Sequence, residues 1–440
     1  MTSFLDKYFK LTENKTSIRK ELIAGVITFL TMSYILTVNP NILADAGMDR
    51  HALFTTTALA TIIATLLMGF MAKLPVAQAP GMGLNSFFAY SVVITMGYTW
   101  QFALTAVFIE GLIFILLTVF NIRELIVNSI PKVIKQAIPV GIGLFIALIG
   151  MKGAGIVVGD ENTLVKLGAF SQHSVWIAML GLVVTAVLFA RNVNGAILIG
   201  IAVATAFGLI LGDVKLPETS IVSLPPSIAP IFAKFEWDHI FTFDMLIVVF
   251  TFLFVNLFDT VGTLIGVVSK AGLADEDGNF PQMKKALLSD AIGTTIGSIL
   301  GTSTITSYVE SASGVASGGR TGLTAVSTAM MFVLALFFAP LFLMVPAAAT
   351  APALIIVGLF MISAVVKINF NDMTEGLPAF LTIAFMPFTY SIAQGIVFGM
   401  LSIAIIKVLA GRFKDISPTV YIIAILFLLK ILLDATKAIS

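Results

Sequence analysis

The chain has 440 residues, of which 58% are hydrophobic and 11% are charged. A soluble globular domain usually has about 25% charged residues, so this composition, with a mean hydropathy of +1.04, excludes an ordinary soluble enzyme and a disordered chain. The 25 basic and 24 acidic residues nearly balance, which gives no reason to expect nucleic acid as a partner. The chain has no cysteine and three scattered histidines, so neither a thiolate site nor a multi-histidine metal site is expected. These features predict an all-α polytopic membrane protein.

Uncharged apolar runs long enough to cross a bilayer, which takes about 20 residues, recur along the whole chain. We predict fourteen segments, of which the third is a half-length helix after Pro80. The others are expected at Leu22–Ala44, Ala52–Ala72, Gln101–Phe120, Val133–Met151, Ser174–Ala190, Gly195–Leu211, Phe243–Val268, Lys285–Leu300, Tyr308–Ser317, Thr321–Val345, Thr350–Val366, Gly376–Thr389 and Ile392–Leu409. A last apolar stretch, Pro418–Leu433, carries Lys430 and is expected to lie at the interface.

Basic residues give the orientation of these segments. Lys and Arg are enriched in cytoplasmic loops, and five of them, Lys7, Lys10, Lys15, Arg19 and Lys20, precede the first segment. The loops around Gly97, Gly301 and Pro346 have almost none. The N-terminus is therefore expected in the cytoplasm of a cell-membrane protein. The first apolar run is too long for a cleavable signal peptide.

Two segments break the helical pattern. The stretch Leu74–Tyr90 has two prolines and two glycines before its apolar run, so a short extended piece at Val76–Ala79 and a half-helix from about Gly81 are expected. The stretch Gly301–Gly319 begins with the β-branched run Thr302–Thr306 and is expected to behave likewise. The two are seven segments apart, so equivalent segments of the two halves run in opposite directions. Such a pair indicates a transporter site, although re-entrant channel loops would also satisfy the pattern.

Three acidic residues lie inside predicted segments, where an ionised side chain costs about 2.5–3.5 kcal/mol on insertion scales and usually faces an interior or a cavity. They are Asp259, Glu310 and Glu110. Each has a structural alternative: Asp259 could bond its own helix, Glu310 could cap the half-helix, and Glu110 could bond a neighbouring helix. Asp290, near Lys284 and Lys285, is expected to be a solvated or paired charge at a helix end.

Four stretches of the sequence resemble the AzgA-like purine permeases, which belong with the nucleobase–ascorbate transporters and the uracil permease. The resemblance runs from about Lys7 to Arg412. It is carried by FLTMSYILTVNPNIL, AQAPGMGLNSFFAY, NLFDTVGTLIG and ESASGVASGGRTGL. It implies two inverted repeats of seven segments, with segments 1–4 and 8–11 forming a core domain and segments 5–7 and 12–14 a gate domain. A homodimer is often formed by the family.

The resemblance also assigns domain limits and a substrate site. The two acids that contact substrate in the family fall on Asp259 and Glu310, and the polar residue of the third segment falls at Asn85, beside the amides of Gly81 to Gly83. The wider family's QNxGxxxxTR signature is changed here, since the stretch reads ESASGVASGGRTG, which argues against uracil or xanthine as substrate. The domain limits are 1–20 (cytoplasmic segment), 21–120 and 243–345 (core), 121–211 and 346–411 (gate), 212–242 (extracellular linker) and 412–440 (C-terminal helix).

The expected function is import of purine nucleobases, with guanine and hypoxanthine as substrates and the proton as coupling ion, because no sodium cage is evident and no cofactor or metal is expected. Adenine is the alternative substrate. An anion transporter of the same architecture and a membrane-embedded enzyme are the rival classes. The predicted substrate-binding residues are Asp259, Glu310, Asn85, Gly81, Met82, Gly83, Ser311, Thr31 and Tyr34, and the predicted proton-coupling residues are Glu310, Asp259 and Glu110.

Overall fold

The computed structural model describes residues 4–120, 131–217, 220–275, 280–422, 424–425 and 427–428. In these ranges it has nine helices that are long and apolar enough to cross a membrane. Three shorter apolar helices cover Met82–Thr95, Ala196–Leu211 and Met373–Phe388. The predicted all-helical membrane class is confirmed in its main feature, while the number of fourteen segments stays a prediction. Positions 423, 426 and 429–440 of the predicted C-terminal helix lie outside the described residues.

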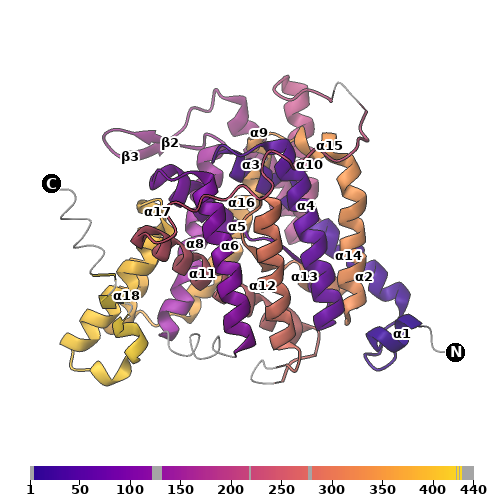
Figure 1. Cartoon of the computed structure of the whole chain (residues 1–440). Helices are drawn as coiled ribbons and strands as arrows, with labels where there is room; N and C mark the ends of the chain where they lie inside the picture. The colour runs from indigo at the N-terminus through magenta and orange to yellow at the C-terminus, as the bar shows by residue number, and fades with distance from the viewer. Residues whose placement is uncertain are drawn as a thin grey trace.

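The elements follow the chain in two stretches of similar content (Figure 1). The first contains α1 (Phe4–Phe9), α2 (Ile18–Met32), α3 (Ile35–Ala44), α4 (Arg50–Leu67), η1 (Met68–Ala72), β1 (Gln78–Pro80), α5 (Met82–Ser86), η2 (Phe87–Thr95), α6 (Trp100–Val119), α8 (Lys132–Gly153), β2 (Val157–Asp160), β3 (Leu164–Leu167), α9 (His173–Ala190) and α10 (Ala196–Leu211). The second contains α11 (Phe243–Lys270), α12 (Met283–Leu300), β4 (Ile305–Ser307), α13 (Ser311–Ala316), α14 (Gly322–Ala335), η3 (Leu336–Phe338), α15 (Ala339–Leu343), α16 (Ala347–Ile362), η4 (Ser363–Lys367), α17 (Met373–Phe388), α18 (Ile392–Leu409) and η5 (Phe413–Asp415).

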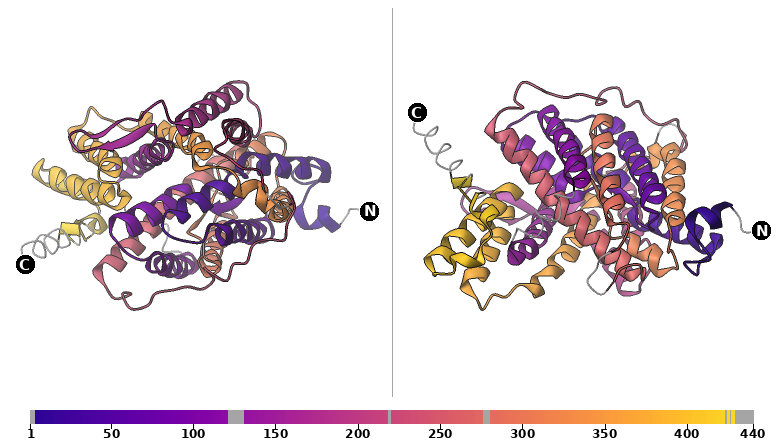
Figure 2. Two further views of the ribbon diagram at one scale, coloured as in Figure 1. Left: turned by 90° about the horizontal axis from the view of Figure 1, so that it is seen from above. Right: turned by 60° about the horizontal axis from the view of Figure 1, so that its bottom comes forward.

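The helices pack into two groups (Figures 1 and 2). The strand-bearing group joins α2–α6 with α11–α14 and includes β1 and β4. The flanking group joins α8–α10 with α16–α18. Each group therefore combines elements from both halves of the sequence. The site described below lies where the strand-bearing group meets the flanking group.

Two short strands from the two halves pair inside the strand-bearing group. β1 and β4 are antiparallel, with Gln78 opposite Ser307 and Pro80 opposite Ile305. The extended pieces predicted at positions 76–79 and 302–306 are thus present, each one to three residues later in the chain. Pairing is required because non-helical backbone at membrane depth must find its hydrogen bonds within the protein. A half-helix follows each strand, α5 after β1 and α13 after β4.

Two predicted continuous helices are interrupted. The first is divided between α2 and α3 at Ser33 and Tyr34, and this break brings Tyr34 to the site. The eleventh is divided by η3, after which Pro340 occupies the first turn of α15. Proline is accepted there because its missing N–H would have no intrahelical partner anyway. The strands β2 and β3, which form a hairpin between α8 and α9, were not expected from the sequence.

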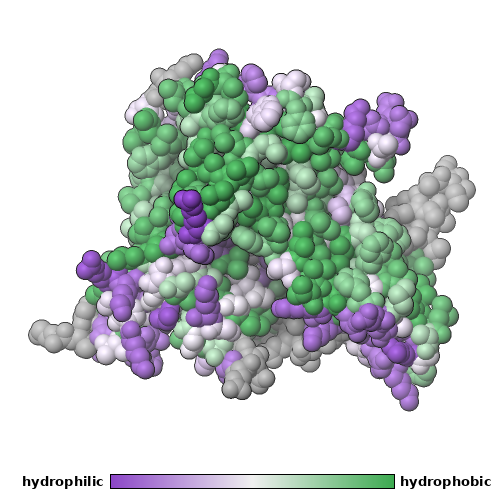
Figure 3. Space-filling model, turned by 180° about the vertical axis from the view of Figure 1, so that it is seen from behind, coloured by the Kyte–Doolittle hydropathy of each residue, from purple (hydrophilic) through white to green (hydrophobic). Residues whose placement is uncertain are grey.

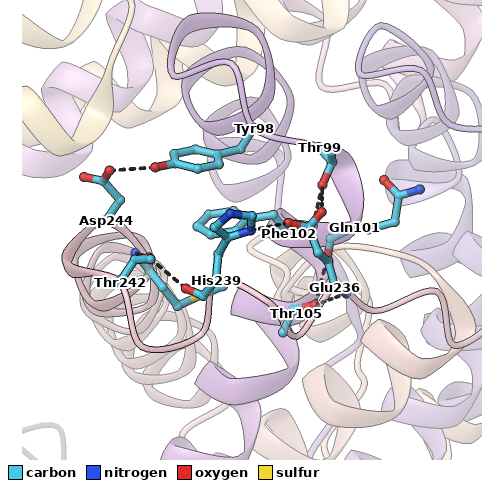
Figure 4. Close-up of polar contacts among 10 residues, drawn as sticks. Tyr98, Thr99, Gln101, Phe102, Thr105, Glu236, His239, Thr242 and Asp244 are labelled. Atoms are coloured by element: carbon cyan, nitrogen blue, oxygen red, sulfur yellow. Dashed lines mark hydrogen bonds and ion pairs between the residues drawn. The ribbon is translucent and has the colours of Figure 1, made fainter.

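The chain that leads from α10 to α11 is fastened to the start of α6 (Figure 4). Glu236 accepts hydrogen bonds from the Thr99 hydroxyl and lies 2.7 Å from His239 Nδ1. The hydrogen bond from the Thr99 hydroxyl lowers the pKa of Glu236 below its ordinary value, and His239 lowers it further by a smaller amount. The Tyr98 hydroxyl donates to Asp244 at 2.6 Å, and the Tyr98 ring stacks on Phe102. These contacts fix the linker between the two sequence halves to the strand-bearing group.

The surface agrees with a membrane environment. Figure 3 shows a broad hydrophobic region over the middle of the molecule, with hydrophilic residues gathered mainly at its lower edge. Many large apolar side chains are exposed to an extent that is unusual for a protein in water; they include Leu116, Val183, Leu334, Leu359 and Phe380.

Candidate functional site

A small cavity lies at the ends of the paired strands. Its volume is about 80 Å³. It is bounded by the break between α2 and α3, the start of α5, the middle of α11, strand β4 with the residues after it, and α16. The lining residues are Tyr34, Met82, Gly83, Asp259, Thr263, Thr306, Ser307, Tyr308, Val309, Glu310, Val357 and Met361. Five of the predicted substrate-binding residues, from four separate segments, therefore meet at one cavity: Tyr34, Met82, Gly83, Asp259 and Glu310.

Glu310 is held by the broken first helix. The Tyr34 hydroxyl donates to Glu310 Oε1 at 2.5 Å, and the Thr31 hydroxyl lies 3.4 Å from the Glu310 carbonyl oxygen. Short hydrogen bonds to a carboxylate are among the strongest in proteins. Tyr34 is fully buried, so its hydroxyl is dedicated to this contact. The Glu310 carboxylate also interacts with its own backbone amide.

Asp259 reaches the cavity from α11. Its carboxylate is hydrogen-bonded by the side chain of Thr306 on β4. Thr263, one helical turn later, lines the same cavity, as expected for residues spaced i and i+4. Asp259 does not bond Asn256, which points away to another network. Gly262 and Gly266 do not mark a close approach either, because a Cβ atom at each would meet no described atom within 4 Å.

A second cavity of about 450 Å³ adjoins the first, and the two share Val309 and Glu310. It extends past Thr31 to the α9–α10 connection and to Lys270 at the end of α11. Phe189 and Phe360 form an edge-to-face pair on its wall, with ring centroids 5.2 Å apart. On the other side of the strand pair, the corresponding space measures about 50 Å³. The two spaces on either side of the strand pair therefore differ in size, and a further cavity of about 330 Å³ is lined by residues that include Thr95, Ile247 and Gln394.

Three predicted residues lie near the strands without lining either cavity. The Gly81 amide already donates to the Thr304 carbonyl at 3.0 Å, and the Ser311 hydroxyl accepts from the Ala77 amide at 3.0 Å. Asn85 is fully buried, and its Oδ1 accepts from the Ser303 hydroxyl. Its Nδ2 has no hydrogen-bond partner among the described residues. A buried donor of this kind usually has a partner in the functioning protein.

Glu110 belongs to a network behind the strands. Its Oε1 accepts from Asn256 Nδ2 at 2.9 Å, and its Oε2 accepts from the Thr304 hydroxyl at 2.8 Å. The Thr260 hydroxyl bridges Asn256 Oδ1 and Asp290 Oδ1, each at 3.0 Å. The expectation that Asp290 is a solvated or paired end charge is wrong, because Asp290 is completely buried in this network.

A further buried acid was not singled out from the sequence. Glu21 is fully buried at the start of α2, and its carboxylate accepts hydrogen bonds from the backbone of Arg320, Thr321 and Thr324 at the start of α14. It thus caps a helix from the other half of the chain, where the N-terminal amides attract a negative charge. The sequence alone does not indicate this contact, since the capping partner lies about 300 residues away in sequence.

The comparison with known proteins decides between the transporter classes. Residues 19–398 match the model of a permease family. The chain is 48% identical over 427 residues to "Adenine permease AdeP" of Escherichia coli, covering 97% of this chain and 96% of that protein. It is 46% identical over 434 residues to "Guanine/hypoxanthine permease PbuG" of Bacillus subtilis, covering 96% and 98%. The chain belongs to the AzgA-like purine permeases.

Solved structures show how widely the fold of this permease is used. The transmembrane domain of a cyanobacterial bicarbonate transporter, BicA, superimposes with a TM-score of 0.65 at 15% identity, covering 87% of this chain and 97% of that one. Murine Slc26a9, an anion transporter in the inward-facing state, gives 0.62 at 12% identity, covering 93% and 72%. These likenesses show the fold alone. The permease is a membrane transporter, and its relatives in sequence are permeases and not enzymes.

Proposed function

We propose that this permease imports guanine and hypoxanthine across the cell membrane together with a proton, with its N-terminus in the cytoplasm. The observation that supports the proposal most is the meeting of Asp259 and Glu310, from the eighth and tenth predicted segments, at one cavity with the start of α5. An anion site would need positive charge at this place, and no Lys or Arg lines the small cavity. A neutral base with N–H donors suits two carboxylates better.

The chemistry of the bases favours oxopurines. Guanine presents N1–H and its exocyclic amine side by side, which suits one ionised carboxylate as a two-point acceptor. Hypoxanthine keeps N1–H, and both bases have a carbonyl that needs a donor. The buried Nδ2 of Asn85, which has no described partner, is a donor of the required kind. It would reach the base after a movement of α5, since Asn85 does not line the cavity in this structure.

Adenine is the second candidate, and the 48% identity to an adenine permease favours it. Adenine lacks N1–H, so one of the two carboxyl groups would have to be protonated in order to donate to N1. The 46% identity to a guanine/hypoxanthine permease is nearly as high. Identity alone therefore does not rank the two, and the proposal rests on the donor and acceptor pattern of the cavity.

The uneven cavities support alternating access. The large cavity reaches the α9–α10 connection and Lys270, which the distribution of basic residues places on the cytoplasmic side. On the opposite side, Tyr90 donates to Asp45 at 2.7 Å, and the Ser91 hydroxyl donates to the Tyr390 carbonyl at 3.2 Å, so that the second of these bonds joins the two helix groups. We therefore take this conformation as inward-facing, with the strand-bearing group moving against the flanking group in the transport cycle.

The test is uptake of labelled hypoxanthine by proteoliposomes with an imposed inward proton gradient, competed by guanine, adenine, uracil and sulfate. Uptake blocked by guanine and abolished by an uncoupler is the expected result. The Asp259→Asn variant should lose at least tenfold in uptake, because its amide cannot accept two N–H groups, while its yield and monodispersity stay unchanged. Inhibition by adenine alone would reassign the substrate, and wild-type uptake by Asp259→Asn would remove that residue from the site.

A further inference from the structure

The two acids at the cavity and the third acid behind it have different surroundings. Asp259 and Glu310 line the cavity, and Glu310 is already engaged by Tyr34. A carboxylate that accepts two purine N–H groups, one on each oxygen, must stay ionised to do so. If both cavity acids serve the base in this way, the co-transported proton needs another acceptor. Glu110 is a fully buried carboxyl group outside both cavities.

We propose that Glu110 binds the co-transported proton and acts on the substrate site from behind, through Asn256 and Thr304. This inference rests on the proposed function, since it assigns the coupling step of the same site. The proton arrives from the outer solution, forms an O–H bond on the carboxylate of Glu110, and leaves to the cytoplasm. No other bond is made or broken.

The position of Glu110 connects it to both halves of the site. Asn256, which donates to its Oε1, lies on α11, three residues before Asp259 on the same helix. Thr304, which donates to its Oε2, directly precedes β4, and its carbonyl accepts the Gly81 amide at the start of α5. A change in the hydrogen bonds of Glu110 therefore acts on α11, which carries Asp259, on β4, which carries Thr306, and on the start of α5.

Protonation of Glu110 must change these hydrogen bonds. As described, both oxygens accept, which an ionised carboxylate can do and a protonated one cannot. A proton on Oε1 would face the donor Asn256 Nδ2, so the amide must rotate to offer Oδ1. That rotation takes the acceptor Oδ1 away from the Thr260 hydroxyl, which then keeps only Asp290. A proton on Oε2 would instead make the Thr304 hydroxyl turn and accept.

Several charged groups lie on the elements that pack against α6. The elements that pack on α6 include α11, α12 and η2. Their charged or titratable side chains are Asp244, Asp259 and Lys270 on α11, Lys284, Lys285 and Asp290 on α12, and Tyr90 on η2. The lysines lie at the ends of their helices, and Lys284 donates to the Val119 carbonyl at the end of α6. Asp290 is joined to Glu110 through Thr260 and Asn256.

The experiment compares two modes of transport in one variant. Glu110→Gln can keep both neighbours, with Oε1 accepting from Asn256 and Nε2 donating to the Thr304 oxygen, but it cannot carry a proton. In proteoliposomes, wild type is expected to accumulate hypoxanthine under an inward proton gradient and to exchange labelled for unlabelled hypoxanthine without a gradient. Glu110→Gln is expected to exchange hypoxanthine at a rate within about threefold of the wild-type rate. Its accumulation of hypoxanthine is expected to be at least tenfold lower than that of wild type. Glu21→Gln, another fully buried acid in a membrane helix, is the matched control and should keep the wild-type ratio of accumulation to exchange.

Each outcome decides the proposal. Accumulation by Glu110→Gln with the proton dependence of wild type overturns it, while the proposed function stands. A wild type that transports hypoxanthine without any response to protons overturns proton symport and the role of Glu110 together. If Glu110→Gln fails in both assays, the double variant Glu110→Gln/Asn256→Asp moves the carboxyl group to the other member of the pair. Recovered accumulation in the double variant supports the proposal, and continued inactivity overturns it.

Discussion

At the scale of single residues, the site depends on a few hydrogen bonds between distant segments. The contact between Tyr34 and Glu310 spans 276 positions in sequence and measures 2.5 Å. It exists because the first membrane segment is divided at Ser33 and Tyr34, so that a side chain points along the break and not across a helix face. A phenol donor at this place orients one oxygen of Glu310 at the edge of the cavity.

Removing that donor should weaken substrate binding without unfolding the protein. Hydrogen bonds to charged groups contribute about 1.5–3 kcal/mol, so Tyr34→Phe is expected to raise the KM for hypoxanthine roughly tenfold or more. The measurement is initial uptake over a range of hypoxanthine concentrations, normalised to purified protein. Tyr421→Phe is the control, since the Tyr421 hydroxyl donates to the Phe413 carbonyl far along the chain. A wild-type KM in Tyr34→Phe would show that this contact does not orient Glu310.

At the scale of elements, close approach of helices places the buried acids. Gly111, next to Glu110 on α6, faces α12, where a Cβ atom would lie 2.5 Å from Thr295 Oγ1 and 3.0 Å from the Thr295 amide nitrogen. The absence of a side chain at Gly111 therefore lets α6 lie against α12. This close packing holds Glu110 within reach of Asn256 and Thr304.

Adding a methyl group at this contact should separate the two helices. Because the obstructing atoms include backbone, Gly111→Ala is expected to destabilise the protein by about 1–3 kcal/mol, the usual cost of overpacking, and to lower uptake. Gly262→Ala on α11 is the matched control: no described atom lies within 4 Å of its Cβ position, and alanine favours a helix by up to about 1 kcal/mol over glycine. Thermal unfolding in detergent measures both. Equal melting temperatures for the two variants would contradict the tight α6–α12 contact.

The elements also show which features the sequence could predict. The two broken segments were predictable because proline, glycine and β-branched residues act on their own backbone, and the intramembrane acids Asp259 and Glu310 stood out by charge alone. The partners of Asp290 and Glu21 were not predictable, because each is bonded to residues on other helices. For the same reason, Asn256 offered itself as a partner within α11, whereas its amide donates a hydrogen bond to Glu110, 146 positions earlier in the chain. A single sequence shows where polar groups lie but not which of them meet.

At the scale of the whole molecule, both helix groups draw on both halves of the chain, and in the proposed mechanism their relative motion exposes the strand pair to one side at a time. The absence of native cysteine makes this motion measurable with single introduced thiols. Asn194 lies on the wall of the 450 Å³ cavity, and Thr350 lies on the wall of the 50 Å³ space on the opposite side. In an inward-facing resting state, Asn194→Cys is therefore expected to react readily with a membrane-impermeant maleimide in inside-out vesicles. Thr350→Cys is expected to react at least tenfold more slowly in right-side-out vesicles.

The same two thiols should respond in opposite directions when the outer contact is weakened. The Tyr390 ring packs against Phe145 and Tyr90 and carries Lys152 Nζ 4.8 Å from its centroid, so it joins the two helix groups on the packed side. Tyr390→Ala removes these contacts and is expected to speed labelling of Thr350→Cys and to slow labelling of Asn194→Cys, because one opening closes as the other forms. Faster labelling at both positions would indicate general loosening in place of alternating access. Unchanged labelling at both would mean that the outer side is held shut by other contacts, such as the bond from Tyr90 to Asp45.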